Sequence, residues 1–303
     1  MISVSTNLCN WLYWFGGAMR FVTVRHDDHQ RVALEAESDP HQLGLIPLPF
    51  SSLLDVIDAG DALPSPLEWV NVSDVQLLAP VPSPRRGILC VGMNYRAHSL
   101  EFSQSGFDSS SSKVTEHPDF PIVFSKFGAS VVGPGAIVDL LPQATSQVDY
   151  EAELGVFIKK PGRDIPIEEA MNFVWGYTAI NDITARDRQK RHQQWLLGKT
   201  LDGFCPMGPR AVTTDEVDLA NTRVTCHVND ELRQDANTSD LIFSVPEIIS
   251  VISEGFTLQP GDLIATGTPA GVGIGQDPPR FLKAGDQVRI EISNVGVLEN
   301  SFK

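Results

Sequence analysis

Short apolar segments broken by polar turns run along most of the chain, and this pattern predicts strands more often than helices. Apolar residues alternate on both sides of a polar turn at 26–30, which predicts a hairpin over residues 20–34. A second hairpin is predicted around Asn229–Asp230, with further strands at 77–81 and 287–297. Segments 50–59 and 244–255 have the spacing of short helices. The pattern predicts an α+β fold rich in strands.

The segment 148–187 contains two strand-like runs, VDYEAELGVFI and WGYTAI, in which three acidic residues stand out. Side chains two residues apart in a strand project from the same face, so we expect Glu151 and Glu153 side by side. Adjacent carboxylates repel each other unless a cation or protons neutralise them. Asp182 follows the second run and can add a third oxygen. The segment therefore predicts a site for a divalent cation.

The ligand types of this predicted site indicate which ion it would take. All three are hard oxygen ligands without Cys or His, a set that favours Mg²⁺, Mn²⁺ or Ca²⁺ over Zn²⁺. An isolated E-x-E pattern is more often a solvated strand face, because charged residues are mostly exposed. The motifs around it, described below, favour the metal site.

Two further pairs of polar residues have the spacing of a helix face. His98 and Glu101 lie three apart, and Glu101 could orient the imidazole as a general base requires. Arg186 and Gln189 follow Asp182 at four and seven residues, which predicts one shared helical face. They could bind a carboxylate and a keto or enol oxygen. The alternative for both pairs is a solvated surface.

Lys199 lies between glycine and apolar residues in LLGKTLDGF, which predicts a buried ammonium group. It could neutralise enolate charge beside the metal or, with a lowered pKa, form a Schiff base.

The serine-rich segment 103–119 is predicted to be a flexible loop, either a lid over the substrate or an uninvolved insertion. The glycine-rich segment 267–273 lacks the order G-x-G-x-x-G, so no nucleotide site is predicted.

Composition limits the partners and the location. The 303 residues carry a net charge of −15, which argues against nucleic acid or an anionic membrane as a partner. No apolar run approaches the roughly 20 residues of a membrane-spanning helix. Four widely spaced cysteines without a CxxC pair indicate a reducing compartment. We expect a cytoplasmic protein, with a mitochondrial location as the alternative.

Prolines mark the expected domain boundary. Five of them between positions 64 and 84 precede the apolar run GILCVG. We therefore expect a small N-terminal domain at 19–84 and a main catalytic domain at 85–303. Residues 1–18 are expected to be an N-terminal extension. They lack the basic residues of a secretory signal or a mitochondrial presequence, so neither is predicted.

Four motifs in order, DYEAELGVFIKK, GYTAINDITARDRQ, QWLLGKTLDGFCPMGP and PGDLIATGTPAGVG, resemble the signatures of the fumarylacetoacetate hydrolase family. Within the family, VGMNYRAH and IVFSKFGASVVGP are most similar to the domain-containing protein 2 branch. The resemblance covers the chain from about residue 85 and implies a mixed β-roll with a small N-terminal domain, and a homodimer. It implies that Glu151, Glu153 and Asp182 bind Mg²⁺, with Mn²⁺ or Ca²⁺ as alternatives.

The resemblance also implies roles for other side chains. It implies a catalytic group of His98, Glu101 and Lys199, and substrate contacts from Tyr95, Arg186, Gln189, Thr266, Gly267 and Thr268. The expected substrate is a small 2-oxo or dicarbonyl acid.

We expect hydrolysis of a C–C bond in a 2,4-dioxo acid through a metal-bound enolate. Tautomerisation or decarboxylation of oxaloacetate is the alternative, because all three reactions share one enolate complex. A catalytically inactive metal-binding protein is the alternative of another class.

Overall fold

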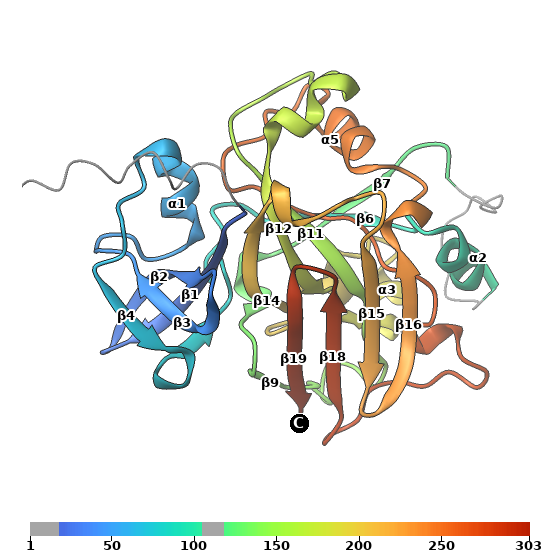
Figure 1. The fold of residues 1–303 in the computed structure, drawn as a ribbon. Helices are drawn as coiled ribbons and strands as arrows, with labels where there is room; N and C mark the ends of the chain where they lie inside the picture. Colours follow the sequence, from blue (N-terminus) through green and yellow to red (C-terminus); the bar gives the residue numbers. More distant parts are fainter. Residues whose placement is uncertain (1–17, 105–117) are drawn as a thin grey trace, which may run out of the picture.

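The computed structural model describes residues 18–104 and 118–303 and shows a strand-rich fold with few, short helices (Figure 1). The predicted strand-rich α+β class is therefore confirmed. Almost all of the predicted extension at 1–18, and most of the predicted loop at 103–119, lie outside the described residues. No helix of the described residues combines the length and apolar character needed to cross a membrane.

The helices of the described residues are α1 (Leu53–Ala59), α2 (Arg96–Gln104), α3 (Arg186–His192), α4 (Leu196–Lys199) and α5 (Val245–Ser253). The two helices predicted at 50–59 and 244–255 are present as α1 and α5. Helix α2 extends through Gln104, so the predicted loop begins later than expected. Single 3₁₀ segments occupy Gly60–Ala62, Val72–Asp74, Gly128–Ser130, Ile167–Phe173, Thr214–Glu216, Thr238–Asp240 and Gly273–Gly275.

One large sheet joins strands from the whole chain. Its strands are β1 (Arg20–His26), β2 (His29–Ala36), β3 (Asp39–Leu45), β4 (Glu68–Asn71), β5 (Gln76–Leu78), β6 (Ile88–Gly92), β7 (Ile122–Lys126), β8 (Val131–Val132), β11 (Ala152–Ile158), β12 (Val174–Asn181), β14 (Cys205–Thr213) and β17 (Leu263–Ala265). They run in the order β4-β3-β2-β1-β14-β12-β11-β17-β6-β7, with β5 on β1 and β8 on β14. Strand β7 is thus at one end of this order.

A second sheet faces the first. It contains β9 (Ile137–Val138), β15 (Arg223–Val228), β16 (Glu231–Asn237), β18 (Gln287–Ile292) and β19 (Gly296–Phe302), in the order β16-β15-β18-β19-β9. A small ladder pairs β10 (Val148–Asp149) with β13 (Thr184–Ala185). Both predicted hairpins are present, β1–β2 and β15–β16.

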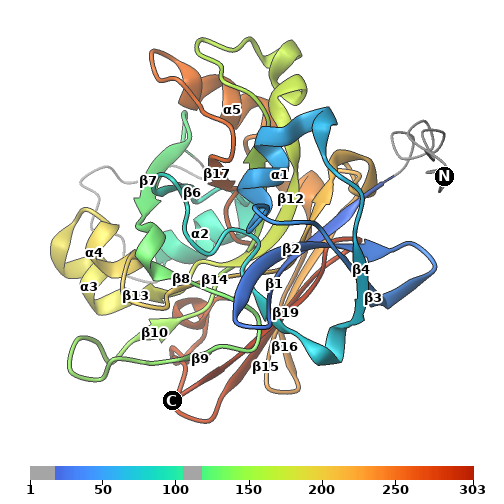
Figure 2. The ribbon, with the colours of Figure 1, turned by 90° about the vertical axis from the view of Figure 1, so that its left-hand side faces the viewer.

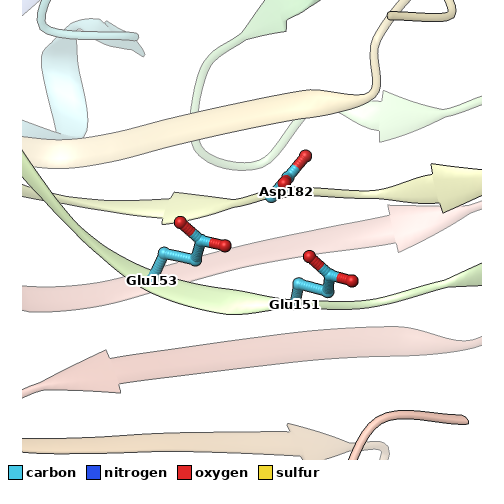
Figure 3. A group of neighbouring side chains, drawn as sticks. All are labelled: Glu151, Glu153 and Asp182. Carbon is cyan, nitrogen blue, oxygen red and sulfur yellow. The ribbon is translucent and has the colours of Figure 1, made fainter. Parts of the chain in front are cut away.

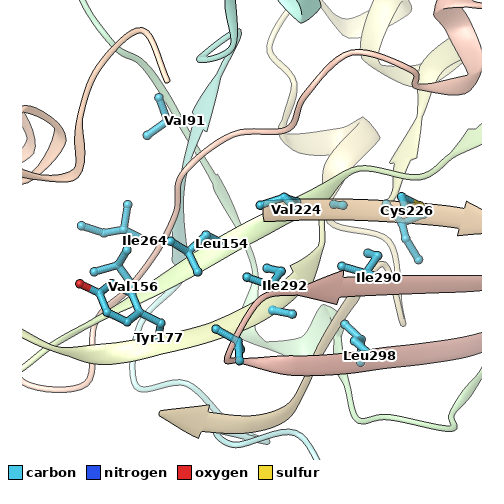
Figure 4. Close-up of a cluster of buried hydrophobic side chains, with 14 of the residues drawn as sticks. Val91, Leu154, Val156, Tyr177, Val224, Cys226, Ile264, Ile290, Ile292 and Leu298 are labelled. Carbon is cyan, nitrogen blue, oxygen red and sulfur yellow. The ribbon is translucent and has the colours of Figure 1, made fainter. Parts of the chain in front are cut away.

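The main hydrophobic core lies between the two sheets (Figure 4). From the large sheet it receives Leu154 and Val156 of β11 and Tyr177 of β12; from the second sheet it receives Val224, Cys226, Ile290, Ile292 and Leu298. Because side chains alternate along β11, Glu153 and Phe157 project from the opposite face. The charged site is therefore built on the face of β11 that points away from this core.

The N-terminal strands extend the large sheet sideways (Figure 2). Strand β1 pairs with β14, and Phe21 of β1 packs 5.8 Å from the ring of Trp175, measured between centroids. Trp175 in turn contacts Phe157 at 6.4 Å. This aromatic row connects the N-terminal strands to the strand that carries the acidic residues. The division into domains at 84/85 stays a prediction.

Replacing Phe157 with Ala should therefore destabilise the fold by about 3–5 kcal/mol, because it leaves a cavity in a fully buried aromatic contact. The measurement is the free energy of unfolding in urea. Leu67→Ala is the control, since Leu67 is 75% exposed and its loss should change stability by no more than about 0.5 kcal/mol. Equal unfolding free energies for both variants would contradict this account of the core.

Candidate active site

The pairing of β11 with β12 brings three carboxylates together (Figure 3). Ala152 lies opposite Asn181, and the backbone N–H of Asp182 donates to the carbonyl of Glu151 at 2.8 Å. Glu151, Glu153 and Asp182 each offer one oxygen, and these oxygens lie within 4.8 Å of one another. All three residues are buried. The strand register thus brings all three carboxylates together, whereas the alternation of side chains in the sequence placed only Glu151 and Glu153 side by side.

Glu151 and Asp182 are already held by buried cations. Lys199 Nζ lies 2.6 Å from Glu151 Oε2 and 2.7 Å from Asp182 Oδ2. Arg186 Nη2 forms a second ion pair, 2.6 Å from Glu151 Oε1. Burial alone would raise the pKa of Glu151, but Lys199 and Arg186 lower it to about 2. Glu151 is therefore ionised at neutral pH.

Glu153 has no such counter-ion in the part of the chain that the structure describes, and its uncompensated charge indicates whether the site suits a metal cation. None of the ion pairs among the described residues includes Glu153, which accepts a hydrogen bond from the backbone of Gly267 at 2.8 Å. Burial raises its pKa, and the charges of Asp182 and Glu151 raise it further. A divalent ion bound by the three hard oxygens would remove this repulsion, so the residues fit such an ion.

Lys199 is buried as the sequence predicted, and its state as an ammonium follows from its neighbours. Burial by itself would lower the pKa of Lys199, but Asp182 and Glu151 outweigh this effect and raise it. A Schiff base needs a lowered pKa, so this arrangement favours charge neutralisation. The ammonium also lies 4.9 Å from the centroid of the Phe124 ring.

Arg186 and Gln189 both lie on α3 and contact each other, since Arg186 Nη1 donates to Gln189 Oε1 at 3.1 Å. The predicted continuation of this face back to Asp182 is wrong, because α3 begins at Arg186 and the short strand β13 separates it from Asp182. Arg186 Nε donates to Asp149 Oδ2 at 2.9 Å. Arg186 is therefore fixed by two buried carboxylates, Asp149 and Glu151, before any substrate is present.

His98 and Glu101 lie on α2 and form a pair, with His98 Nδ1 3.1 Å from Glu101 Oε2. A carboxylate only accepts hydrogen bonds, so Nδ1 carries the proton and Nε2 is free to take one. The backbone N–H of Gly271 donates to the other Glu101 oxygen at 3.0 Å. A side chain on Gly275 would overlap the Glu101 carboxylate, so the loop can approach only with glycine at this position.

A pocket joins the dyad to the acidic group. Its charged and polar lining residues are His98, Glu151, Glu153, Arg186, Gln189, Lys199 and Thr268. Its other wall is apolar and is formed mainly by Val91, Met93, Phe102, Phe124 and Trp195. Trp195 contacts both Phe102 and Phe124, with centroid distances of 5.9 and 5.3 Å. One pocket thus has a charged wall and an aromatic wall.

The other residues expected to contact substrate lie close behind the pocket. Thr266 is fully buried and donates to the carbonyl of Leu154 at 3.0 Å, and Gly267 contacts Glu153. Tyr95 is 2% exposed and is not one of the described residues that line the pocket. Of the predicted contacts, Arg186, Gln189 and Thr268 therefore line the pocket, whereas Tyr95, Thr266 and Gly267 are not among its described lining residues.

Two charged residues of the site escaped the sequence analysis. Asp149 is fully buried and accepts from the backbone of Gly273 at 2.6 Å as well as from Arg186. Lys126 is also fully buried and donates to Asp182 Oδ1 at 2.6 Å. Lys126 lies within the apolar run IVFSKF, so a lysine in an otherwise apolar strand was the available signal.

The sequence is similar to those of known proteins. A model of the fumarylacetoacetate (FAA) hydrolase C-terminal region matches residues 87–303. The chain belongs to the fumarylacetoacetate hydrolase family. It is 43% identical over 300 residues to the oxaloacetate tautomerase YisK of Bacillus subtilis, covering 93% of this chain and 96% of that protein. It is 45% identical to the human mitochondrial oxaloacetate tautomerase FAHD2A, covering 79% and 73%. The predicted similarity to the domain-containing protein 2 branch is confirmed.

Solved structures of this family share the fold. A fumarylacetoacetate hydrolase from Exiguobacterium antarcticum has a TM-score of 0.82 at 38% identity, over 94% of this chain and 99% of that one. A maleylpyruvate hydrolase from Sphingobium, solved with manganese and pyruvate, has a TM-score of 0.70 at 29% identity, over 94% and 98%. The chain is an enzyme of this family, in which similar proteins are named hydrolases, isomerases or tautomerases.

Glu153→Gln should abolish stabilisation by Mg²⁺ or Mn²⁺, because the amide removes one anionic ligand and the repulsion that an ion would relieve. A ligand at 100 times its Kd stabilises the native protein by about 2.7 kcal/mol, a shift that thermal unfolding resolves. Glu169→Gln, at an exposed acidic residue, is the control and should respond to metal as the wild type does. An undiminished metal response in Glu153→Gln would refute the site.

Proposed function

We propose that this protein is a Mg²⁺- or Mn²⁺-dependent tautomerase that interconverts the keto and enol forms of oxaloacetate. The observation that carries the proposal is the buried acidic group with its uncompensated Glu153, facing Lys199 and the His98–Glu101 pair across one pocket. The naming of similar proteins as oxaloacetate tautomerases supports the choice of reaction. Sequence analysis ranked C–C hydrolysis first, and these relatives favour its alternative.

Glu151, Glu153 and Asp182 would hold the ion. A divalent ion bound there supplies a Lewis acid for the 2-oxo group of the substrate. The buried side chains around it include four carboxylates and three cations, so the group carries one net negative charge when all four carboxylates are ionised. Adding two positive charges makes it net positive, which suits an anionic oxo acid. We therefore expect oxaloacetate to bind well only to the metal-loaded protein.

The proton transfer follows from the pair on α2. His98 Nε2 is free to accept a proton because Nδ1 is engaged by Glu101. His98 would remove a proton from C3 of the keto form; the electron pair of that C–H bond would form the C2–C3 double bond, and the π pair of C2=O would move onto the oxygen. The imidazolium would then give a proton to this oxygen, which yields the enol and restores neutral His98. In the reverse direction, the imidazolium returns a proton to C3.

Two cations would stabilise the negative charge that develops on oxygen. Lys199 lines the pocket as an ammonium and needs no protonation step to do so. Arg186 is held in place by Asp149 and Gln189, so its guanidinium is oriented in advance for a substrate carboxylate. Gln189 and Thr268 offer neutral hydrogen-bonding groups at the same wall.

Incubation of the metal-loaded enzyme with oxaloacetate should accelerate the change in enol absorbance without release of pyruvate or CO₂. His98→Ala should reduce this rate about 10²-fold or more, the usual loss when a general base is removed. His41→Ala, at an exposed histidine, should leave it unchanged. Acylpyruvates and fumarylacetoacetate are tested in parallel. Cleavage of one of them into two acids, with no effect on oxaloacetate, would restore hydrolysis as the function.

We also propose a homodimer that forms through the edge strand β7. Strand β7 ends the order of the large sheet, and Phe120, Val123 and Phe127 are 73%, 42% and 53% exposed. A sheet edge with exposed apolar side chains is a surface that another chain commonly covers. A cytoplasmic or a mitochondrial location stays a prediction.

Sedimentation at micromolar concentration should give the mass of a dimer. Val123→Lys should shift the protein to monomers, since the charge lies at the centre of the proposed contact and opposes pairing of the edge. Arg163→Glu, at an exposed residue, serves as a control and should not change the mass. A wild-type monomer would contradict the proposal.

A further inference from the structure

Lys126 is a fully buried lysine that does not line the pocket. It is the last residue of β7 and lies opposite Ile88 of β6. Its Nζ donates to Asp182 Oδ1 at 2.6 Å and to the carbonyl of Ile183 at 3.0 Å. An ammonium in this position is bound to both the side chain and the adjoining backbone of one acidic residue. Lys126 therefore fixes the orientation of the Asp182 carboxylate.

The two oxygens of Asp182 have different partners. Lys126 binds Oδ1, whereas Oδ2 lies 2.7 Å from Lys199. Lys199 lines the pocket, so Oδ2 is on the side from which an ion can be shared. Oδ1 is bound to an ammonium that also donates to the carbonyl of Ile183 and does not line the pocket. Both oxygens are thus in buried ion pairs, but only the cation at Oδ2 lines the pocket. An ion that enters from the pocket can share Oδ2 with Lys199, whereas ligation through Oδ1 would require breaking the ion pair with Lys126.

We propose that Lys126 is a positioning residue that confines Asp182 to ligation through a single oxygen, and that it thereby makes the site prefer Mg²⁺ or Mn²⁺ to Ca²⁺. This inference rests on the metal site of the proposed function. Mg²⁺ requires near-octahedral geometry with short bonds, whereas Ca²⁺ accepts six to eight oxygens and often takes both oxygens of one carboxylate. A carboxylate restricted to one oxygen suits the smaller ion.

A simpler role for Lys126, that of a counter-ion for Asp182, makes a different prediction. Removing a positive charge near the site increases the attraction for every divalent cation by a similar amount, because Mg²⁺ and Ca²⁺ carry the same charge. That effect cancels in the ratio of the two dissociation constants. A change in coordination does not cancel, since only the larger ion gains from a second oxygen. The ratio therefore separates the two roles.

The test measures the dissociation constants of Mg²⁺, Mn²⁺ and Ca²⁺ by calorimetry for the full-length wild type and Lys126→Met. Methionine has a similar length and no charge. Loss of a residue that orients a metal ligand commonly changes metal affinity about 10–100-fold. We expect the preference for Mg²⁺ over Ca²⁺ to fall at least about tenfold in the variant, with Mn²⁺ following Mg²⁺.

Arg210→Met is the matched control, because it removes a cation from the buried carboxylate of Glu35, 2.6 Å away and outside the acidic site. It should leave the Mg²⁺/Ca²⁺ ratio unchanged. If Lys126→Met does not fold, Lys126→Gln replaces it, and a smaller shift in the same direction is expected because the amide is neutral but polar.

The outcomes distinguish the inference from the proposed function. A wild type that binds Mg²⁺ or Mn²⁺ and a variant with an altered ratio support the role of Lys126. A wild type that binds these ions and a variant with an unchanged ratio overturn that role and leave the metal site intact. A wild type that binds none of the three ions overturns the metal site and the inference together.

Discussion

The structure of the site depends on charge compensation among side chains that are buried in the protein interior. Seven charged side chains form one buried group: Asp149, Glu151, Glu153, Asp182, Lys126, Arg186 and Lys199. Transferring a single unpaired charge into a protein interior costs several kcal/mol. Removing one member of a buried ion pair is therefore destabilising, because it leaves the other member unpaired. The segments that supply these residues are far apart in the sequence. Ion pairs connect all of these side chains except Glu153, which explains why the site can be rigid although Glu151 and Asp182 lie just outside the regular strands.

Buried amides give this group a backbone frame. Asn94 donates to the carbonyls of Thr266 and Phe243, and Gln234 donates to Thr268 Oγ1 and the carbonyl of Pro269 while accepting from the backbone of Ala152. These two side chains join the segment 266–269 to β11, to β16 and to the start of α2. The same segment continues to Gly271, whose N–H binds Glu101. The acidic group and the dyad are therefore attached to one frame, and a shift in either would break buried hydrogen bonds.

Local patterns predicted the parts of the site that local geometry determines. Alternation placed Glu151 and Glu153 together, and the apolar surroundings of Lys199 predicted its burial. Patterns failed where the chain turns: Asp182 and Arg186 were assigned to one helix face, but two residues of β13 intervene. Lys126 and Asp149 were not singled out at all, because neither has a partner close to it in the sequence. Only the pairing of β6 with β7 and of β10 with β13 brings these two residues to their partners.

The aromatic wall bears on the choice between proton transfer and hydrolysis. Hydrolysis needs a water molecule beside the base, with polar groups to orient it. In the described part of the pocket, the ring of Phe102 lies 6.3 Å from that of His98, and Phe102 packs against Trp195, so the side next to the base is apolar. Phe124 covers one side of Lys199 in the same way. An apolar surface on this side offers no hydrogen-bonding groups to orient an attacking water, and it strengthens the electrostatic interactions of Lys199 beside it. The aromatic wall is therefore compatible with the proposed proton transfer, which needs a base beside the substrate carbon but no ordered water.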